Sequence, residues 1–149
     1  MSRSTEASLA ALDRVLLLAT LIDEDMSLGL EAMGLTTSRV GVVWLVHQSG
    51  PRTQRELAEA LAVTPRNVTG LVDALVETGF VTRVQHPTDR RATQVTLTKR
   101  GARVGVELTE GRRQFASALF ADLSDRRFAT IVAGLDALLE RLPAVLASG

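Results

Sequence analysis

The sequence predicts a mainly α-helical fold that carries one small β-hairpin. Hydrophobic residues make up 46% of the 149 residues and aromatic residues only 3%, so the core must be aliphatic. Apolar residues recur at three- and four-residue steps along most of the chain, which is the spacing of one helix face. Between residues 81 and 97 the period changes to two, which favours β-strands.

The first expected helix covers residues 6 to about 28. Its stripe consists of Leu9, Leu12, Leu16, Ala19 and Ile22, and Leu17, Leu18 and Leu21 widen it. A helix that is apolar nearly all round must be buried on several sides. Gly29 and Gly34 are expected to end this helix.

A second helix is expected to begin at Thr36 or Thr37, either of which can cap it, and to run to about Gln48. Val40, Val43, Trp44 and His47 share one of its faces. The sequence Ser49-Gly50-Pro51 then stops the helix.

Two short helices joined by a tight turn are expected next. Thr53 and Glu56 form a capping box at the start of a helix that reaches Leu61. After the break at residues 62–64, Pro65 occupies the first position of a fourth helix, where its missing N–H does no harm. Gly79 stops this helix, whose aliphatic stripe consists of Val68, Leu71, Val72, Leu75 and Val76.

A β-hairpin and two further helices complete the expected fold. Residues 81–85 and 94–97 predict two strands, and residues 86–92 form a polar turn between them. Thr98 can cap a fifth helix that runs to about Ala121. Ser124 and Asp125 open a sixth helix, which Pro143 is expected to kink or to end early.

Composition excludes several classes of protein. The absence of cysteine excludes a disulfide scaffold, a thiolate metal site and a cysteine redox switch. His47 and His86 are the only histidines, and they lie far apart in the chain, so we expect neither a metal nor a cofactor. No apolar run approaches the length of a membrane span, and no signal peptide is evident, so we expect a cytoplasmic protein.

The charges are unevenly distributed although they sum to zero. Residues 52–103 carry nine basic and five acidic side chains, a net charge of +4, which the rest of the chain balances. A basic middle between acidic flanks favours an anionic partner such as nucleic acid. The alternative is an ordinary solvated surface with uneven charge.

The pair of short helices with a three-residue turn indicates a helix-turn-helix, and the hairpin indicates its wing. The early outer face of the fourth helix carries Arg66, Asn67, Thr69 and Gly70, with Thr64 at the cap, away from the aliphatic stripe. Arg can read guanine, Asn can read adenine, and Thr can contact a methyl group or a phosphate. The alternative for this face is solvent exposure without function.

The hairpin tip adds Asp89, Arg90 and Arg91, which suit contact with a minor groove or a phosphate. Asp89 could hold one arginine while the other reaches out, or the tip could be an ordinary surface salt bridge. The expected DNA contacts are therefore Thr64, Arg66, Asn67, Thr69, Gly70, Arg83, Asp89, Arg90 and Arg91.

The run from Asp89 to Gly101 resembles the wing signature of MarR-type regulators, D-x-R followed by a strand that ends in Leu-Thr and then a Gly. The helix-turn-helix of that family is also similar to Leu57-Ala58, Val68-Thr69, Leu71-Val72-Asp73, Leu75 and Gly79-Phe80-Val81. The resemblance implies a winged helix-turn-helix lobe at residues 36–98 and dimerisation helices at residues 1–35 and 99–149. It implies a homodimer that grips a palindromic operator in double-stranded DNA, with Arg90 or Arg91 in the minor groove.

The family often binds small aromatic or anionic effectors, which implies a repressor that a ligand releases. Candidates for such a pocket are Met26, Met33, Trp44, His47 and Phe115. Met and aromatic residues more often fill gaps in a core, so core packing is the preferred interpretation. The peroxide-sensing branch depends on a cysteine that this chain lacks, and a zinc-sensing branch does not fit its two histidines.

Two other classes of function compete with DNA binding. An enzyme would need a nucleophile with a base or a carboxylate pair, and the sequence has no cysteine, no G-x-S-x-G motif and no phosphate-binding glycine loop. We therefore expect no enzymatic activity. A winged helix that binds only proteins has no need of arginines on the wing or of Arg66 and Asn67.

Overall fold

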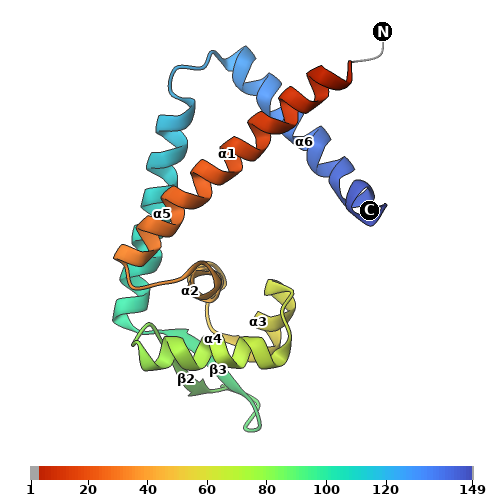
Figure 1. Ribbon diagram of the computed structural model, residues 1–149. Helices are drawn as coiled ribbons and strands as arrows, with labels where there is room; N and C mark the ends of the chain where they lie inside the picture. Colours follow the sequence, from red (N-terminus) through yellow and green to blue (C-terminus); the bar gives the residue numbers. More distant parts are fainter. Residues whose placement is uncertain (1–3, 149) are drawn as a thin grey trace. The chain divides into compact units, whose positions relative to one another are not determined.

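The computed structural model describes residues 4–148 and has six helices and three short strands within them (Figure 1). The elements are α1 (Thr5–Ala32), α2 (Thr37–Ser49), β1 (Arg52–Thr53), α3 (Gln54–Leu61), α4 (Pro65–Glu77), β2 (Val81–Gln85), β3 (Thr93–Leu97), α5 (Lys99–Phe120) and α6 (Asp125–Ala147). The chain divides into one compact unit that ends at Leu108 and a second that begins at Thr109. The predicted fold class, mainly α with a small β wing, is confirmed.

Side-chain caps begin the helices where the sequence predicted them. Thr36, rather than Thr37, caps α2 by accepting a hydrogen bond from the Arg39 N–H. The capping box of α3 is present, because Thr53 and Glu56 each accept a backbone N–H from the other. Ser124 caps α6 in the same way as Thr36 caps α2.

The prediction that Gly29 ends the first helix is wrong. α1 continues to Ala32, because one glycine inside a helix costs only about 1 kcal/mol and the following turn buries Leu30. Gly34 does stop the chain from continuing as a helix. It has φ +77°, a left-handed conformation that favours glycine, and the Leu35 N–H after it donates back to the Leu30 carbonyl.

Pro143 was expected to kink the last helix or to end it early, and the second of these alternatives is wrong. α6 continues through Pro143 to Ala147. A proline removes one N–H donor and restricts its neighbour, but the four residues that follow keep helical geometry. A proline near the C-terminus of a helix therefore does not by itself end that helix.

The wing is a three-stranded antiparallel sheet in the order β1-β3-β2, not the two-stranded hairpin that was predicted. β2 pairs with β3 from Val81 opposite Leu97 to Gln85 opposite Thr93. β1 adds two residues to the other side of β3, with Arg52 opposite Val95. Two residues are too few to show a period of two, so the sequence pattern could not reveal β1.

The aliphatic core lies between α2, α3, α4 and the sheet. Its largest completely buried side chains are Leu57 from α3, Leu75 from α4 and Phe80 before β2. Val104 is the buried side chain through which the start of α5 joins this core. The core therefore fixes the orientation of α4, and with it the outer face of that helix.

The long helices expose most of their apolar residues. On α1, six leucines between Leu9 and Leu21 are each 51–58% exposed, and α6 has no buried residue. The expectation that the first helix is buried on several sides is thus not met within one chain. Within residues 4–148, no helix is both long enough and apolar enough to cross a lipid bilayer.

The capping box predicts how stability depends on pH. A hydrogen bond from the Thr53 backbone N–H is the main cause that lowers the pKa of Glu56 from its ordinary value of 4.5. The charged form is therefore favoured by folding, and this stabilisation is complete above the ordinary pKa and lost as the pH falls through the lowered one. We expect the melting-temperature gap between wild type and Glu56→Gln to narrow from pH 7 to pH 3. A melting-temperature difference that stays constant over this pH range would contradict the stabilising role of the charged Glu56 side chain.

Candidate nucleic-acid interface

A three-residue turn joins α3 to α4 and sets the angle between them. Ala62 has φ +53°, which lies in the left-handed region, and the Val63 N–H donates to the Ala58 carbonyl at 3.1 Å. Thr64 then caps α4 by accepting a hydrogen bond from the Asn67 N–H at 3.2 Å. Because the hydroxyl oxygen of Thr64 is the acceptor in this bond, its own proton can still be donated to another group.

α4 has one buried face and one exposed face. Val68, Val72 and Leu75 are completely buried, at 1% exposure or less. Arg66, Asn67, Thr69 and Gly70 are all exposed, as the sequence predicted. The first two turns of α4 therefore present hydrogen-bonding side chains to solvent on a rigid, well-anchored helix.

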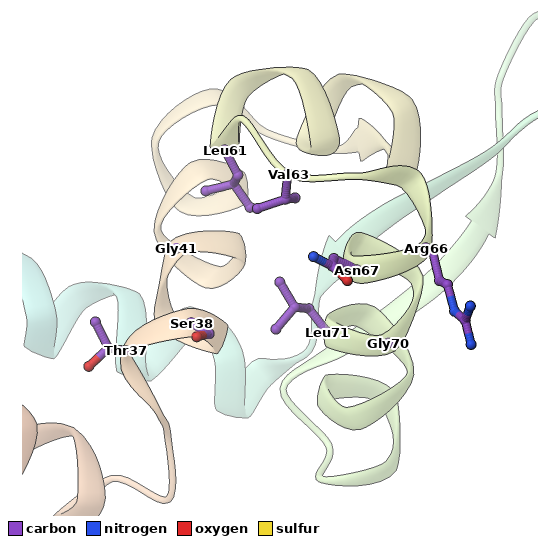
Figure 2. Close-up of a pocket in the computed structure, with 9 residues that line it drawn as sticks. All are labelled: Thr37, Ser38, Gly41, Leu61, Val63, Arg66, Asn67, Gly70 and Leu71. Carbon is purple, nitrogen blue, oxygen red and sulfur yellow. The ribbon is translucent and has the colours of Figure 1, made fainter. Parts of the chain in front are cut away.

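A groove of about 590 Å³ runs along α4 on the side that faces α2. It is lined by Thr37, Ser38, Gly41, Leu61, Val63, Arg66, Asn67, Gly70 and Leu71. Figure 2 shows the Arg66 side chain pointing away from this groove, whereas Asn67 lies in it on the side of Leu71. Asn67 is therefore not clear of the aliphatic stripe, because it stands one turn before Leu71 on the same side.

A second groove, of about 580 Å³, lies between α4 and α3. Gln54, Arg55 and Glu59 of α3 line it opposite Pro65 and Thr69 of α4. The first turn of α4 thus forms a ridge with a groove on each side. A ridge of this kind is the shape that can enter the major groove of B-DNA, which admits one α-helix.

The tip of the wing is organised by its own side chains. The His86 Nδ1 accepts hydrogen bonds from the backbone N–H groups of Thr88 and Asp89, at 3.2 and 3.1 Å. Asp89 Oδ1 accepts from the Arg91 backbone N–H at 2.9 Å. Asp89 therefore shapes the loop through the backbone, and within residues 4–148 no ion pair involves Arg90 or Arg91. Both guanidinium groups are exposed.

Thr69 and Arg83, two of the expected DNA contacts, bond to other residues of the lobe. Arg83 of β2 forms a salt bridge with Asp73 of α4 and donates to Gln54 Oε1. Gln54 Nε2 donates in turn to Thr69 Oγ1 at 3.0 Å. The roles of Gln54 and His86 were not predicted, because neither the first residue of a short helix nor a lone histidine in a turn indicates a partner.

The five candidate pocket residues are only partly brought together. The rings of Trp44 and His47, both half-buried on α2, lie 6.3 Å apart. Met33 packs against the core, whereas Met26 is 55% exposed. Phe115 belongs to the second unit and is exposed there. Neither of the two grooves beside α4 is lined by any of these five residues.

Known proteins resemble this chain in sequence and in fold. Residues 35–93 match the MarR family. The chain is 34% identical over 107 residues to YwoH, an uncharacterised HTH-type transcriptional regulator of Bacillus subtilis (strain 168), over 72% of this chain and 77% of YwoH. It is 36% identical over 87 residues to the HTH-type transcriptional repressor YetL of the same organism, over 58% of this chain and 52% of YetL.

A solved structure shows how closely the fold agrees. The crystal structure of Streptococcus pneumoniae FabT in complex with DNA matches with a TM-score of 0.84, over 93% of this chain and 99% of FabT. At 17% identity this likeness concerns the fold alone. Together, the matched residues 35–93, the relationship to YwoH and the winged fold show that the chain belongs to the MarR family of winged helix-turn-helix transcriptional regulators.

Proposed function

We propose that this protein is a homodimeric repressor that binds a palindromic operator in double-stranded DNA and reads its sequence with α4. One observation carries the proposal. The first turn of α4 directs Arg66 outwards and places Asn67 in the groove beside α2, while Val68, Val72 and Leu75 anchor the helix in the core. FabT, which shares the fold, is a DNA-bound protein, and YetL, a relative in sequence, is a repressor.

In this proposal α4 enters the major groove with its N-terminal end first. Arg66 points outwards and can donate two hydrogen bonds to a guanine, and Asn67 can pair with an adenine. Gly70 leaves open space, because a Cβ added there would meet nothing within 4 Å. Thr64 and the helix N-terminus are suited to a neighbouring phosphate.

The wing supplies the second contact in this proposal. Arg90 and Arg91 are exposed and have no carboxylate partner within residues 4–148. Their loop is held by the hydrogen bonds to His86 and Asp89, so two cations are presented on a fixed support. Such a tip can reach the phosphates or the minor groove beside the site that α4 reads.

Arg90→Ala combined with Arg91→Ala tests the wing. We expect the double variant to weaken binding to every duplex about equally, and the slope of log affinity against log salt to fall by about 2, because two phosphate contacts are lost. A titration at several salt concentrations measures both quantities. Normal binding by the double variant would show that the wing does not contact DNA.

A dimer is part of the proposal because one chain leaves too much apolar surface in water. Six leucines of α1 and several aliphatic residues of α6 are exposed, and a second copy is the occupant that a palindromic operator requires. The two copies of α4 would then lie about 34 Å apart, one turn of B-DNA. We expect sedimentation at micromolar concentration to give a mass of twice 16.0 kDa. A monomer would contradict this part of the proposal.

Release by a small aromatic or anionic ligand is the regulatory part of the proposal. Trp44 and His47 offer adjacent half-buried rings on α2. Trp44 is the only tryptophan of the chain, so its fluorescence reports on this site alone. Benzoate is a suitable first probe, and the proposal expects it to change this fluorescence and to release operator DNA over one concentration range. A fluorescence change without release of DNA would contradict a regulatory role for the site.

A gel shift with fragments from the genome tests the proposed function as a whole. Some fragments should be retarded in the presence of excess scrambled duplex, and others should not. Uniform retardation would indicate a DNA-binding protein without sequence preference. A complete lack of retardation would favour a winged helix that binds only proteins.

A further inference from the structure

Four side chains, linked in series by hydrogen bonds, connect the wing to α4. Arg83 Nη2 lies 2.5 Å from Asp73 Oδ1, and Arg83 Nε donates to Gln54 Oε1 at 3.1 Å. Gln54 Nε2 donates to Thr69 Oγ1 at 3.0 Å. Thr69 and Asp73 stand four residues apart on one face of α4, so the backbone of the helix closes the ring between them. We call Gln54, Thr69, Asp73 and Arg83 the Arg83 ring.

The Arg83 ring joins three separate elements. Arg83 comes from β2, Gln54 from the first position of α3, and the other two residues from α4. The Arg83 side chain is 32% exposed, whereas the arginine of the exposed ion pair Arg113–Glu110 is 73% exposed. The ring therefore holds the guanidinium group against the lobe instead of leaving it extended in water.

Thr69 is committed to the same ring. Its hydroxyl donates its single proton to the Pro65 carbonyl at 2.9 Å and accepts from Gln54. Because a hydroxyl has only one proton, Thr69 in this state has none to give to a phosphate. Two residues that sequence patterns assign to DNA contact are thus engaged with each other through Gln54.

We propose that Arg83 is a positioning residue, which acts through Asp73 and Gln54 to set the angle between the wing and the reading face of α4. This inference rests on the proposed function. A duplex must meet Arg66 and Asn67 of α4 and the arginines of the wing at the same time, so a small rotation between them weakens binding. Asp73, the partner of Arg83, is 61% exposed, and an ion pair with so exposed a partner contributes little to stability, so the ring should affect DNA affinity far more than folding.

The direction in which Asp73→Ala changes the affinity for DNA distinguishes a positioning role of Arg83 from direct contact with DNA. If Arg83 instead contacts a phosphate, Asp73→Ala should strengthen DNA binding, because it frees the guanidinium and removes a negative charge near the DNA. If Arg83 positions the wing, Asp73→Ala should weaken operator binding by about 2- to 150-fold, the range that corresponds to coupled neighbours. Arg83→Gln should weaken it equally, and the double variant should be no worse than either single one.

The salt dependence gives a second, independent readout. Loss of a phosphate contact lowers the slope of log affinity against log salt by about 1, whereas loss of a positioning residue leaves the slope unchanged. Arg113→Gln is the matched control, because it removes one positive charge from an exposed ion pair in the second unit. It should change neither the affinity nor the slope, and thermal melts should show that all variants fold.

A measurement without DNA distinguishes failure of the ring from failure of the proposed function. The Arg83 Nε–H should exchange slowly with water in the wild type, by ¹⁵N NMR, and faster in Asp73→Ala. Three results would overturn the positioning role. They are tighter DNA binding by Asp73→Ala, a lower slope of log affinity against log salt for Arg83→Gln, and a loss of operator affinity in the double variant that equals the product of the two single losses. If the wild type has no preferred duplex, the positioning role fails with the proposed function even where slow exchange shows that the ring exists.

Discussion

Alanine at Arg66 or at Asn67 is expected to weaken operator binding by about 10- to 100-fold and to leave scrambled DNA much less affected. A bidentate contact to a base edge contributes about 1–3 kcal/mol of discrimination, which corresponds to this range. Both side chains are exposed on the first turn of α4, where a recognition helix penetrates deepest. The measurement is a paired titration of operator and scrambled duplex at one salt concentration.

The two variants should fold normally. The hydrogen bond that caps α4 comes from the backbone N–H of Asn67, so Asn67→Ala leaves it in place. Arg113→Ala serves as the control for the charge that Arg66→Ala removes. Equal losses on operator and scrambled DNA would assign both residues to phosphates. A large fall in melting temperature would show that they support the fold.

Gly101→Ala is expected to cost about 3 kcal/mol or more of stability, at the upper end of what overpacking causes. An added Cβ at this position would lie 2.0 Å from the Phe80 carbonyl oxygen, and that oxygen belongs to the backbone and cannot turn aside. The first turn of α5 and the chain before β2 would have to separate. Thermal unfolding should report a fall of roughly 10 °C.

The close contact between the first turn of α5 and Phe80, which Gly101 permits, also depends on Thr98. The Thr98 hydroxyl is 2.6 Å from the Gly79 carbonyl and 3.1 Å from that of Phe80, and it accepts from the Gly101 N–H. Separation of the two segments would break these bonds as well. The matched control is Gly111→Ala in the same helix, where a Cβ meets nothing within 4 Å and alanine should stabilise by about 0.5–1 kcal/mol. Equal effects of the two substitutions would contradict the packing of α5 on Phe80.

The sequence predicted the helix starts because their signals are local. Each capping side chain accepts a hydrogen bond from the backbone N–H three residues further along the chain, so a short window of sequence contains the whole interaction. The capping residues are Thr36, Thr53, Thr64 and Ser124. The aliphatic stripe of α4 similarly predicted the burial of Val68, Val72 and Leu75, whereas Val76, also assigned to the stripe, is 38% exposed. The exposure of Arg66 and Asn67 followed from the same periodicity.

Interactions between distant segments could not be predicted. The pairing of Arg52 with Val95 and the contact of Arg83 with Gln54 each join residues at least 29 positions apart, and no local pattern encodes them. The continuation of α6 through Pro143 was missed for a local reason, because the cost of one missing helical hydrogen bond does not by itself decide where a helix ends. Arg83 was predicted from the sequence as a DNA contact, and its bond to Asp73 is visible only in the structure.

Selection from a pool of randomised duplexes is the most direct test of sequence-specific DNA binding by this protein. The purified 149-residue chain is mixed with the pool, and bound DNA is sequenced after repeated rounds. We expect an enriched palindrome with half-sites about 10 base pairs apart from centre to centre, as two copies of α4 in successive major grooves require. Arg66→Ala should lose the preference at one position of each half-site. A pool that remains random after selection by the wild type would contradict the proposed function.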